Sequence, residues 1–165
     1  FVRSRAKEVR EGVDAHKTLV ESAAQAQDLK AMREEFTSFD TDAGPMDPDE
    51  RLGHPRGYGS FPRLLGRYVR ELGVLSLEGM VHRMSAVAAN EIMAFDRGRL
   101  APGLAADIVV FDAGTVRDRS TFAEPTLRSE GVRYVLVNGG VVLDDGRYTG
   151  EKPGRVIRGP GYRPQ

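Results

Sequence analysis

The pattern of apolar residues changes near residues 95–99, and this change constrains the fold more than any other feature of the sequence. Before it, apolar residues recur every three or four positions, which is typical of helices with one buried face. After it, short valine-rich runs alternate with glycine- and proline-containing turns, which is typical of antiparallel strands. We therefore predict two regions: residues 1–96, and a small β module with a tail in residues 97–165.

The first region predicts three helices, one short strand and one long loop. The Ala-rich segment 14–35 predicts a helix, and the alternating segment 36–39 predicts a strand. A loop rich in Asp, Pro and Gly follows from residue 42 to Ser60. We expect Ser60 to cap a helix that reaches Arg70. Ser76 is predicted to cap the next helix, whose apolar stripe is Leu77, Met80, Val81, Met84 and Val87.

The second region predicts a small antiparallel module. Strands are expected at residues 107–112, 132–137 and 141–143, with the Asn138-Gly139 pair as the hairpin turn, and a short one at 155–158. From the alternation around the turn we expect one apolar layer, formed by Val135, Val137, Val141 and Leu143.

Composition excludes several classes of partner and site. The 24 basic and 24 acidic residues balance, so no net field draws the chain to nucleic acid or an anionic membrane. No apolar run approaches the roughly 20 residues needed to span a bilayer. Without cysteine there is no disulfide, thiolate zinc site or cysteine nucleophile, which is typical of a reducing compartment and predicts a cytoplasmic protein. The chain begins at Phe1 without an initiator methionine or signal peptide, so we expect a cut there.

Asp42 is the first candidate for chemistry, because it stands directly after a predicted strand and opens the long loop. In (β/α) barrels the catalytic groups lie at the C-terminal ends of the strands. A carboxylate held there can accept a proton from water and deliver it to a leaving nitrogen. The alternative is that Asp40 and Asp42 are turn formers that bind local backbone N–H groups.

The segment that begins at His54 is the second candidate. Arg56 offers a planar fork of donors that matches a carboxylate, and Gly57 and Gly59 let the backbone approach a ligand closely. The alternative is a solvated loop arginine and histidine without a ligand. The other two histidines, His16 and His82, read as structural, and no His-x-His or HExxH motif supplies the three or four ligands of a zinc site.

Taken together, residues 36–158 resemble the N-acyl-D-amino-acid deacylases, a branch of the metal-dependent amidohydrolases. The most specific run is HPRGYGSFPRLLGRYVR at residues 54–70, preceded by TDAG at 41–44. The later motifs GRLAPG, ADIVVFD, YVLVNG and TGEKPGR follow in the family's order. Departures are Thr41-Asp42-Ala43 where the family usually has Ser-Asp-Gly, and the absence of the family's His-x-His and other metal ligands.

This resemblance implies an α/β fold: the C-terminal portion of a (β/α)8 barrel followed by a small β-sandwich module. It implies that Asp42 is the general acid/base and a possible metal ligand, and that Arg56 holds the substrate's α-carboxylate with His54 and Gly57 beside it. It also implies zinc as the cofactor and an N-acyl-D-amino acid as the substrate of a metal-dependent hydrolase.

Because most metal ligands are absent, we expect this chain to be inactive alone, with a missing N-terminal half or a second copy as its partner. The alternatives are a non-catalytic binding or structural module, or one half of a complemented enzyme.

Overall fold

The computed structural model describes residues 26–43 and 54–163, and the chain divides into two compact units, Phe1–Thr37 and Ser38–Gln165. In the first unit residues 26–33 are helical, and the Thr37 hydroxyl donates a 2.8 Å hydrogen bond to the Ala31 carbonyl at the helix end. This confirms the later part of the predicted helix 14–35, whose residues 14–25 lie outside the described ranges.

The predicted strand at residues 36–39 is wrong. Phe36 lies in a turn with 79% of its surface exposed, and residues 37–43 have no regular structure. A strand needs a neighbouring strand for its N–H and C=O groups. All the strands among the described residues pair with one another in one sheet, and none of them pairs with this segment.

The second unit opens with a helix that starts earlier than predicted. Helix α2 spans Arg56–Arg63 and continues as a π-helix, η1, over Leu64–Glu71. Ser60 therefore does not cap it: the residue is already helical, and its hydroxyl donates back to the Arg56 carbonyl at 2.8 Å. Pro62 inside the helix has no N–H to donate, and the wider π turns begin two residues later.

The next helical stretch runs without interruption through α3 (Leu77–His82), η2 (Arg83–Val87) and α4 (Ala88–Glu91). Its start confirms the predicted cap, since the Ser76 hydroxyl accepts the Gly79 N–H at 3.1 Å. The core lies between these helices and the long β1–β2 connection. Its buried apolar residues include Leu64, Leu65, Val74, Met80, Ala86, Ala89, Ala94 and Val116.

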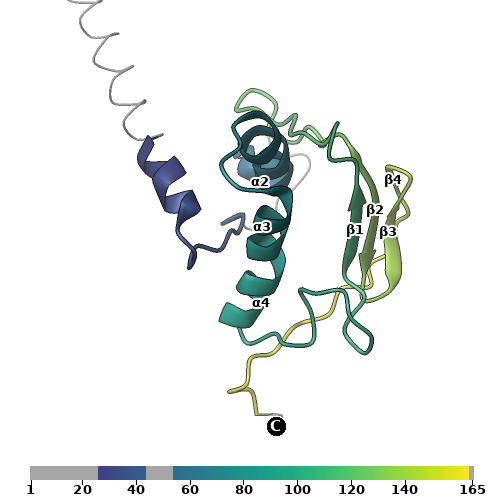
Figure 1. Ribbon diagram of the computed structural model, residues 1–165. Coiled ribbons are helices and arrows are strands. Elements are labelled where there is room, and N and C mark those ends of the chain that lie inside the picture. The colour runs from purple at the N-terminus through teal and green to yellow at the C-terminus, as the bar shows by residue number, and fades with distance from the viewer. Residues whose placement is uncertain (1–25, 44–53, 164–165) are drawn as a thin grey trace, which may run out of the picture. The chain divides into compact units, whose positions relative to one another are not determined.

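The strands form one antiparallel sheet in the order β1-β2-β3-β4. They are Ile108–Phe111, Val132–Val137, Gly140–Asp144 and Arg147–Tyr148. Asn138 and Gly139 have φ of 47° and 83°, as a two-residue type I′ turn requires, so the predicted hairpin is confirmed. The predicted strand at 155–158 is wrong, because this segment pairs with no strand of the sheet. Figure 1 shows the helices following one another and the strands forming a separate layer.

The predicted apolar layer is correct for three residues and wrong for Val141. The two-residue turn pairs Val137 with Gly140 and Leu136 with Val141, so Val141 faces away from Val137 and is 39% exposed. The register shifts at a β-bulge between Val135 and Leu136, and beyond this bulge Leu143 pairs with Val135. Val135, Val137 and Leu143 therefore share one face because of the bulge, not because of simple alternation.

Replacing Val135 by Ala should lower the free energy of unfolding by about 1–3 kcal/mol, since it removes two methyl groups from this face. The Val141→Ala variant is the matched control and should cost less, because Val141 is exposed on the opposite face. Urea unfolding followed by circular dichroism measures both. Equal losses would contradict the assignment of the two faces.

Both the barrel and the sandwich stay predictions, because the described residues form helices and a single sheet. The predicted boundary at 96/97 also stays a prediction and falls inside the second unit. Among the described residues, no helix has the length and apolar character needed to cross a membrane.

Candidate functional site

The structure brings Asp42 and Arg56 together. An Nη1–H of Arg56 donates to Oδ2 of Asp42 at 2.9 Å, with 45% and 85% of the respective side chains exposed. Asp42 adopts the left-handed backbone conformation, with a φ of 44°, and its N–H donates to Oδ1 of Asp40 at 2.6 Å. Asp40 thus performs the turn-forming role considered as an alternative, and this leaves the Asp42 carboxylate available to Arg56.

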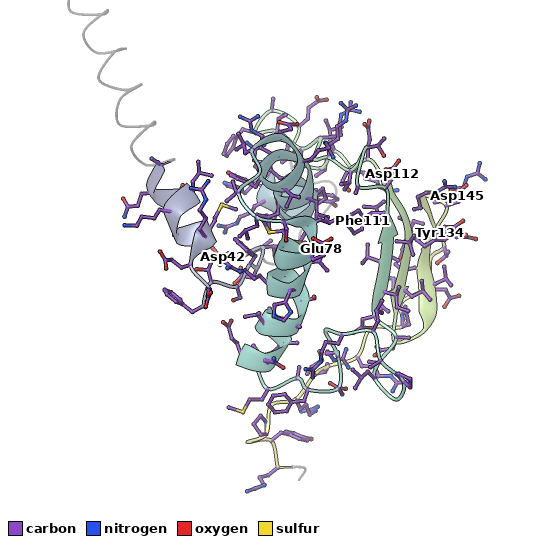
Figure 2. The ribbon with its side chains drawn as sticks, in the orientation of Figure 1. Asp42, Glu78, Phe111, Asp112, Tyr134 and Asp145 are labelled. Atoms are coloured by element: carbon purple, nitrogen blue, oxygen red, sulfur yellow. The ribbon has the colours of Figure 1, made fainter. Side chains whose placement is uncertain are left out.

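His54 and Gly57 form the first turn of α2 around Arg56. Nδ1 of His54 accepts the Arg56 backbone N–H at 3.1 Å, so a neutral imidazole carries its proton on Nε2. The Gly57 N–H donates to the His54 carbonyl at 3.3 Å. The four predicted site residues therefore meet within one exposed patch that contains a carboxylate, a guanidinium and an imidazole. Figure 2 shows Asp42 beside the helices, whereas Tyr134 lies in the sheet and Asp145 in the turn between β3 and β4.

The connection between β1 and β2, residues 112–131, packs along the helix that carries this patch. The Arg70 guanidinium donates to the carbonyls of Ala113 and Val116 at 3.1 and 2.7 Å. Farther along, Arg63 pairs with Asp118 at 3.0 Å. Partial burial acts to lower the pKa of Arg63, but the hydrogen bond and charge of Asp118 raise it above its ordinary value.

Two residues of this connection reach the patch itself, and sequence reasoning missed both. The buried Ser120 hydroxyl donates to the Pro55 carbonyl at 2.9 Å. The Phe122 ring meets the His54 ring edge-on, with centroids 5.0 Å apart and an interplanar angle of 80°. The available signal was length, because a connection longer than about 12–15 residues between two strands is usually functional or disordered.

The described residues do not fit a metal site by themselves. Within residues 26–43 and 54–163, no three side chains of His, Asp or Glu gather closely enough to hold an ion. A catalytic zinc needs about three protein ligands, so Asp42 supplies at most one of them. Its role as a metal ligand stays a prediction.

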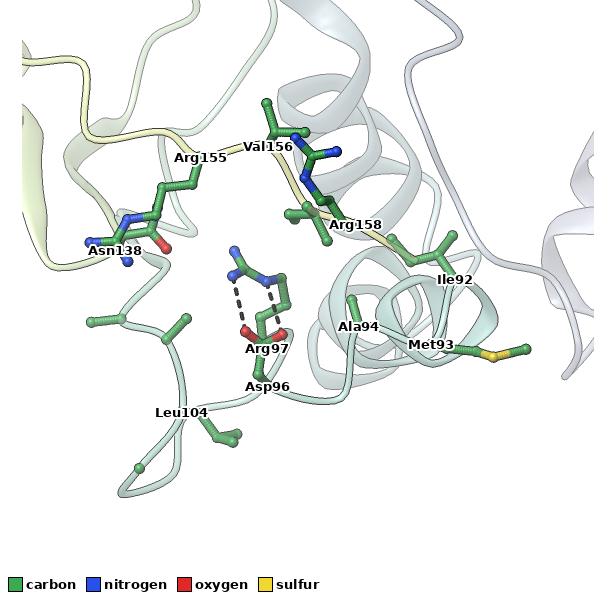
Figure 3. Close-up of a pocket in the computed structure, with 14 residues that line it drawn as sticks. Ile92, Met93, Ala94, Asp96, Arg97, Leu104, Asn138, Arg155, Val156 and Arg158 are labelled. Atoms are coloured by element: carbon green, nitrogen blue, oxygen red, sulfur yellow. Dashed lines mark hydrogen bonds and ion pairs between the residues drawn. The ribbon is translucent and has the colours of Figure 1, made fainter. Parts of the chain in front are cut away.

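A separate pocket of about 690 Å³ lies at the end of α4, and its lining contains neither Asp42 nor Arg56 (Figure 3). Arg97 in its wall is held by Asp96 at 3.2 Å and Asp107 at 2.7 Å. The hydrogen bond to Asp96 raises the pKa of Arg97, and the same bond lowers the pKa of Asp96. This pocket is therefore distinct from the exposed patch that contains Asp42 and Arg56.

Comparison with known proteins identifies the family. The profile of the amidohydrolase family matches residues 37–143. An N-acyl-D-glutamate deacylase from Alcaligenes xylosoxydans xylosoxydans is 50% identical over 111 residues, which are 67% of this chain and 22% of that protein. A D-aminoacylase from the same organism is 44% identical over 110 residues, 67% of this chain and 23% of the relative.

The structural comparison agrees. The chain resembles the crystal structure of an N-acyl-D-glutamate deacylase from Bordetella bronchiseptica complexed with zinc and a phosphonate inhibitor that mimics the tetrahedral intermediate. The TM-score is 0.56 at 50% identity, and the match covers 61% of this chain and 22% of that one. The chain thus spans less than a quarter of the length of the relatives it matches.

Proposed function

Because this chain belongs to the amidohydrolase family, we propose that it is the C-terminal part of a zinc-dependent N-acyl-D-amino-acid deacylase. The relatives at 50% and 44% identity are a deacylase of N-acyl-D-glutamate and a D-aminoacylase. Within this chain, the observation that carries the proposal is the Asp42–Arg56 pair, which lies inside the segment matched to the family.

We propose that Arg56 binds the free carboxylate of the substrate. A guanidinium has five N–H donors, and the one described contact with Asp42 uses a single Nη1 donor. The others remain for a second carboxylate in two-point geometry. The exposed side chain of Arg56 leaves room for that approach.

We assign the proton transfer to Asp42. In an N-acyl amino acid the carboxylate and the amide nitrogen are attached to the same α-carbon. A substrate held by Arg56 therefore has its amide close to the carboxylate that Arg56 also contacts, which is Asp42. Asp42 accepts a proton from the attacking water and delivers it to the leaving nitrogen as the C–N bond breaks.

The larger architecture is part of the same proposal. Residues 1–96 would form the end of a (β/α)8 barrel and residues 97–165 most of a small β domain. The zinc of the complete enzyme would be held mainly by residues outside this sequence, since no three candidate ligands gather in the described ranges.

The test is hydrolysis of N-acetyl-D-amino acids with added zinc, by the 165-residue chain and by a full-length protein that contains it. We expect no measurable hydrolysis by the short chain, because the described part of it does not assemble a metal site. The full-length protein should hydrolyse the D-substrates and lose activity with a chelator. Activity of the short chain would contradict the fragment assignment, and inactivity of the full-length protein would contradict the deacylase.

A further inference from the structure

The β1–β2 connection runs antiparallel to the helix that carries Arg56. Its contacts follow one another in reverse order along the two segments: Val116 meets Arg70, Asp118 meets Arg63, Ser120 meets Pro55 and Phe122 meets His54. The connection therefore ends, in space, at the N-terminal turn of α2.

Two glycines on the helix permit this close approach. A Cβ atom added at Gly66 would lie 2.7 Å from the Val116 carbonyl oxygen, and one at Gly59 would lie 2.3 Å from Oγ of Ser120. They are about two helical turns apart and so lie on the same side of the helix. At these two glycines the connection thus lies directly against the helix backbone, with no side chain of the helix between them.

The two last contacts act on the backbone and ring next to Arg56. The Ser120 hydroxyl binds the carbonyl of Pro55, the residue before Arg56, at the start of the helix. Phe122 packs on the His54 ring, whose Nδ1 accepts the Arg56 N–H. Phe122 is 78% exposed and contributes little to the core, so its described aromatic contact serves the site more than the fold.

We propose that Ser120 and Phe122 are positioning residues that hold Arg56 for the substrate's carboxylate and so set the preference for a free carboxylate. This inference rests on the proposed function. Neither residue touches the substrate. Ser120 fixes the peptide before Arg56, and Phe122 fixes the His54 imidazole, which accepts the backbone N–H of Arg56. Replacing either residue should therefore weaken only the binding of the substrate's carboxylate by Arg56.

The experiment compares an N-acyl-D-amino acid with its α-carboxamide, in the full-length protein with zinc. Ser120→Ala and Phe122→Leu should each raise KM for the acid by about three- to tenfold, the range for one lost hydrogen bond or aromatic contact. Turnover should change little. Hydrolysis of the carboxamide should be unaffected, because it offers Arg56 no charge to bind.

Controls separate positioning from stability. Phe122→Tyr keeps the ring and should restore the wild-type KM. Phe95→Leu changes another exposed phenylalanine, 61% exposed, and should have no effect on either substrate. The NMR signals of the His54 ring protons should shift in Phe122→Leu, which reports the contact independently of activity. Equal changes for acid and carboxamide, or none, would overturn the positioning role.

A failure of the proposed function would look different. If the wild-type protein hydrolyses neither compound, the deacylase itself is wrong. If it hydrolyses both equally well and Arg56→Met changes nothing, the role of Arg56 is wrong. The positioning role alone is wrong if Arg56→Met removes the preference for the acid while Ser120→Ala and Phe122→Leu leave it intact.

Discussion

Replacing Asp42 by Asn in the full-length protein should lower turnover by about 10²–10⁴-fold, the contribution typical of general acid–base catalysis. The amide side chain has the shape of the carboxylate but cannot accept the proton of the attacking water. The substrate should still bind through Arg56, so KM should change much less than kcat. Steady-state kinetics with N-acetyl-D-amino acids measures both constants.

The matched control is Asp145→Asn. Asp145 also has a φ of 44° and also pairs with an arginine, Arg133, but it lies in the turn between β3 and β4 (Figure 2). Asparagine tolerates the left-handed conformation as aspartate does, so neither variant should lose stability through its backbone. Turnover should stay at the wild-type level in the control. An unimpaired Asp42→Asn enzyme would remove Asp42 from the mechanism.

Replacing Gly131 by Ala should lower the free energy of unfolding by about 3–5 kcal/mol, from backbone strain and overpacking together. Gly131 has a φ of 82°, which alanine adopts only with strain. A Cβ atom there would also lie 2.4 Å from the Cα and 2.5 Å from the nitrogen of Val116. Val116 is fully buried in the core and cannot yield easily.

Gly150→Ala is the control that separates the two costs. Gly150 has a φ of 90°, but a Cβ atom there would meet nothing within 4 Å. Its replacement should cost only the backbone strain, about 1–2 kcal/mol. Denaturant unfolding of both variants measures the difference. Equal losses would mean that the contact with Val116 is relieved without cost.

Several local features were predictable because residues close in sequence decide them. The Asn138-Gly139 turn needs two residues with positive φ, and the sequence supplies the pair most suited to it. The Ser76 cap needs only a hydroxyl and an N–H three residues later, at Gly79. The sequence also supplied Asp42 and Arg56 as candidates, and the structure joins them by a hydrogen bond, although their catalytic roles remain a proposal.

The sequence alone determined the elements whose partners are close neighbours along the chain: the hairpin turn at Asn138-Gly139 and the Ser76-capped helix. Only the tertiary structure decided those whose partners are distant. Segment 36–39 forms no strand because none of the described strands pairs with it, and the position of Leu143 follows from a bulge. Ser120 and Phe122 reach the site only because Gly59 in α2 and Gly66 in η1 let their connection lie against the helix. Such contacts depend on how closely two backbones approach, which no local pattern of residues records.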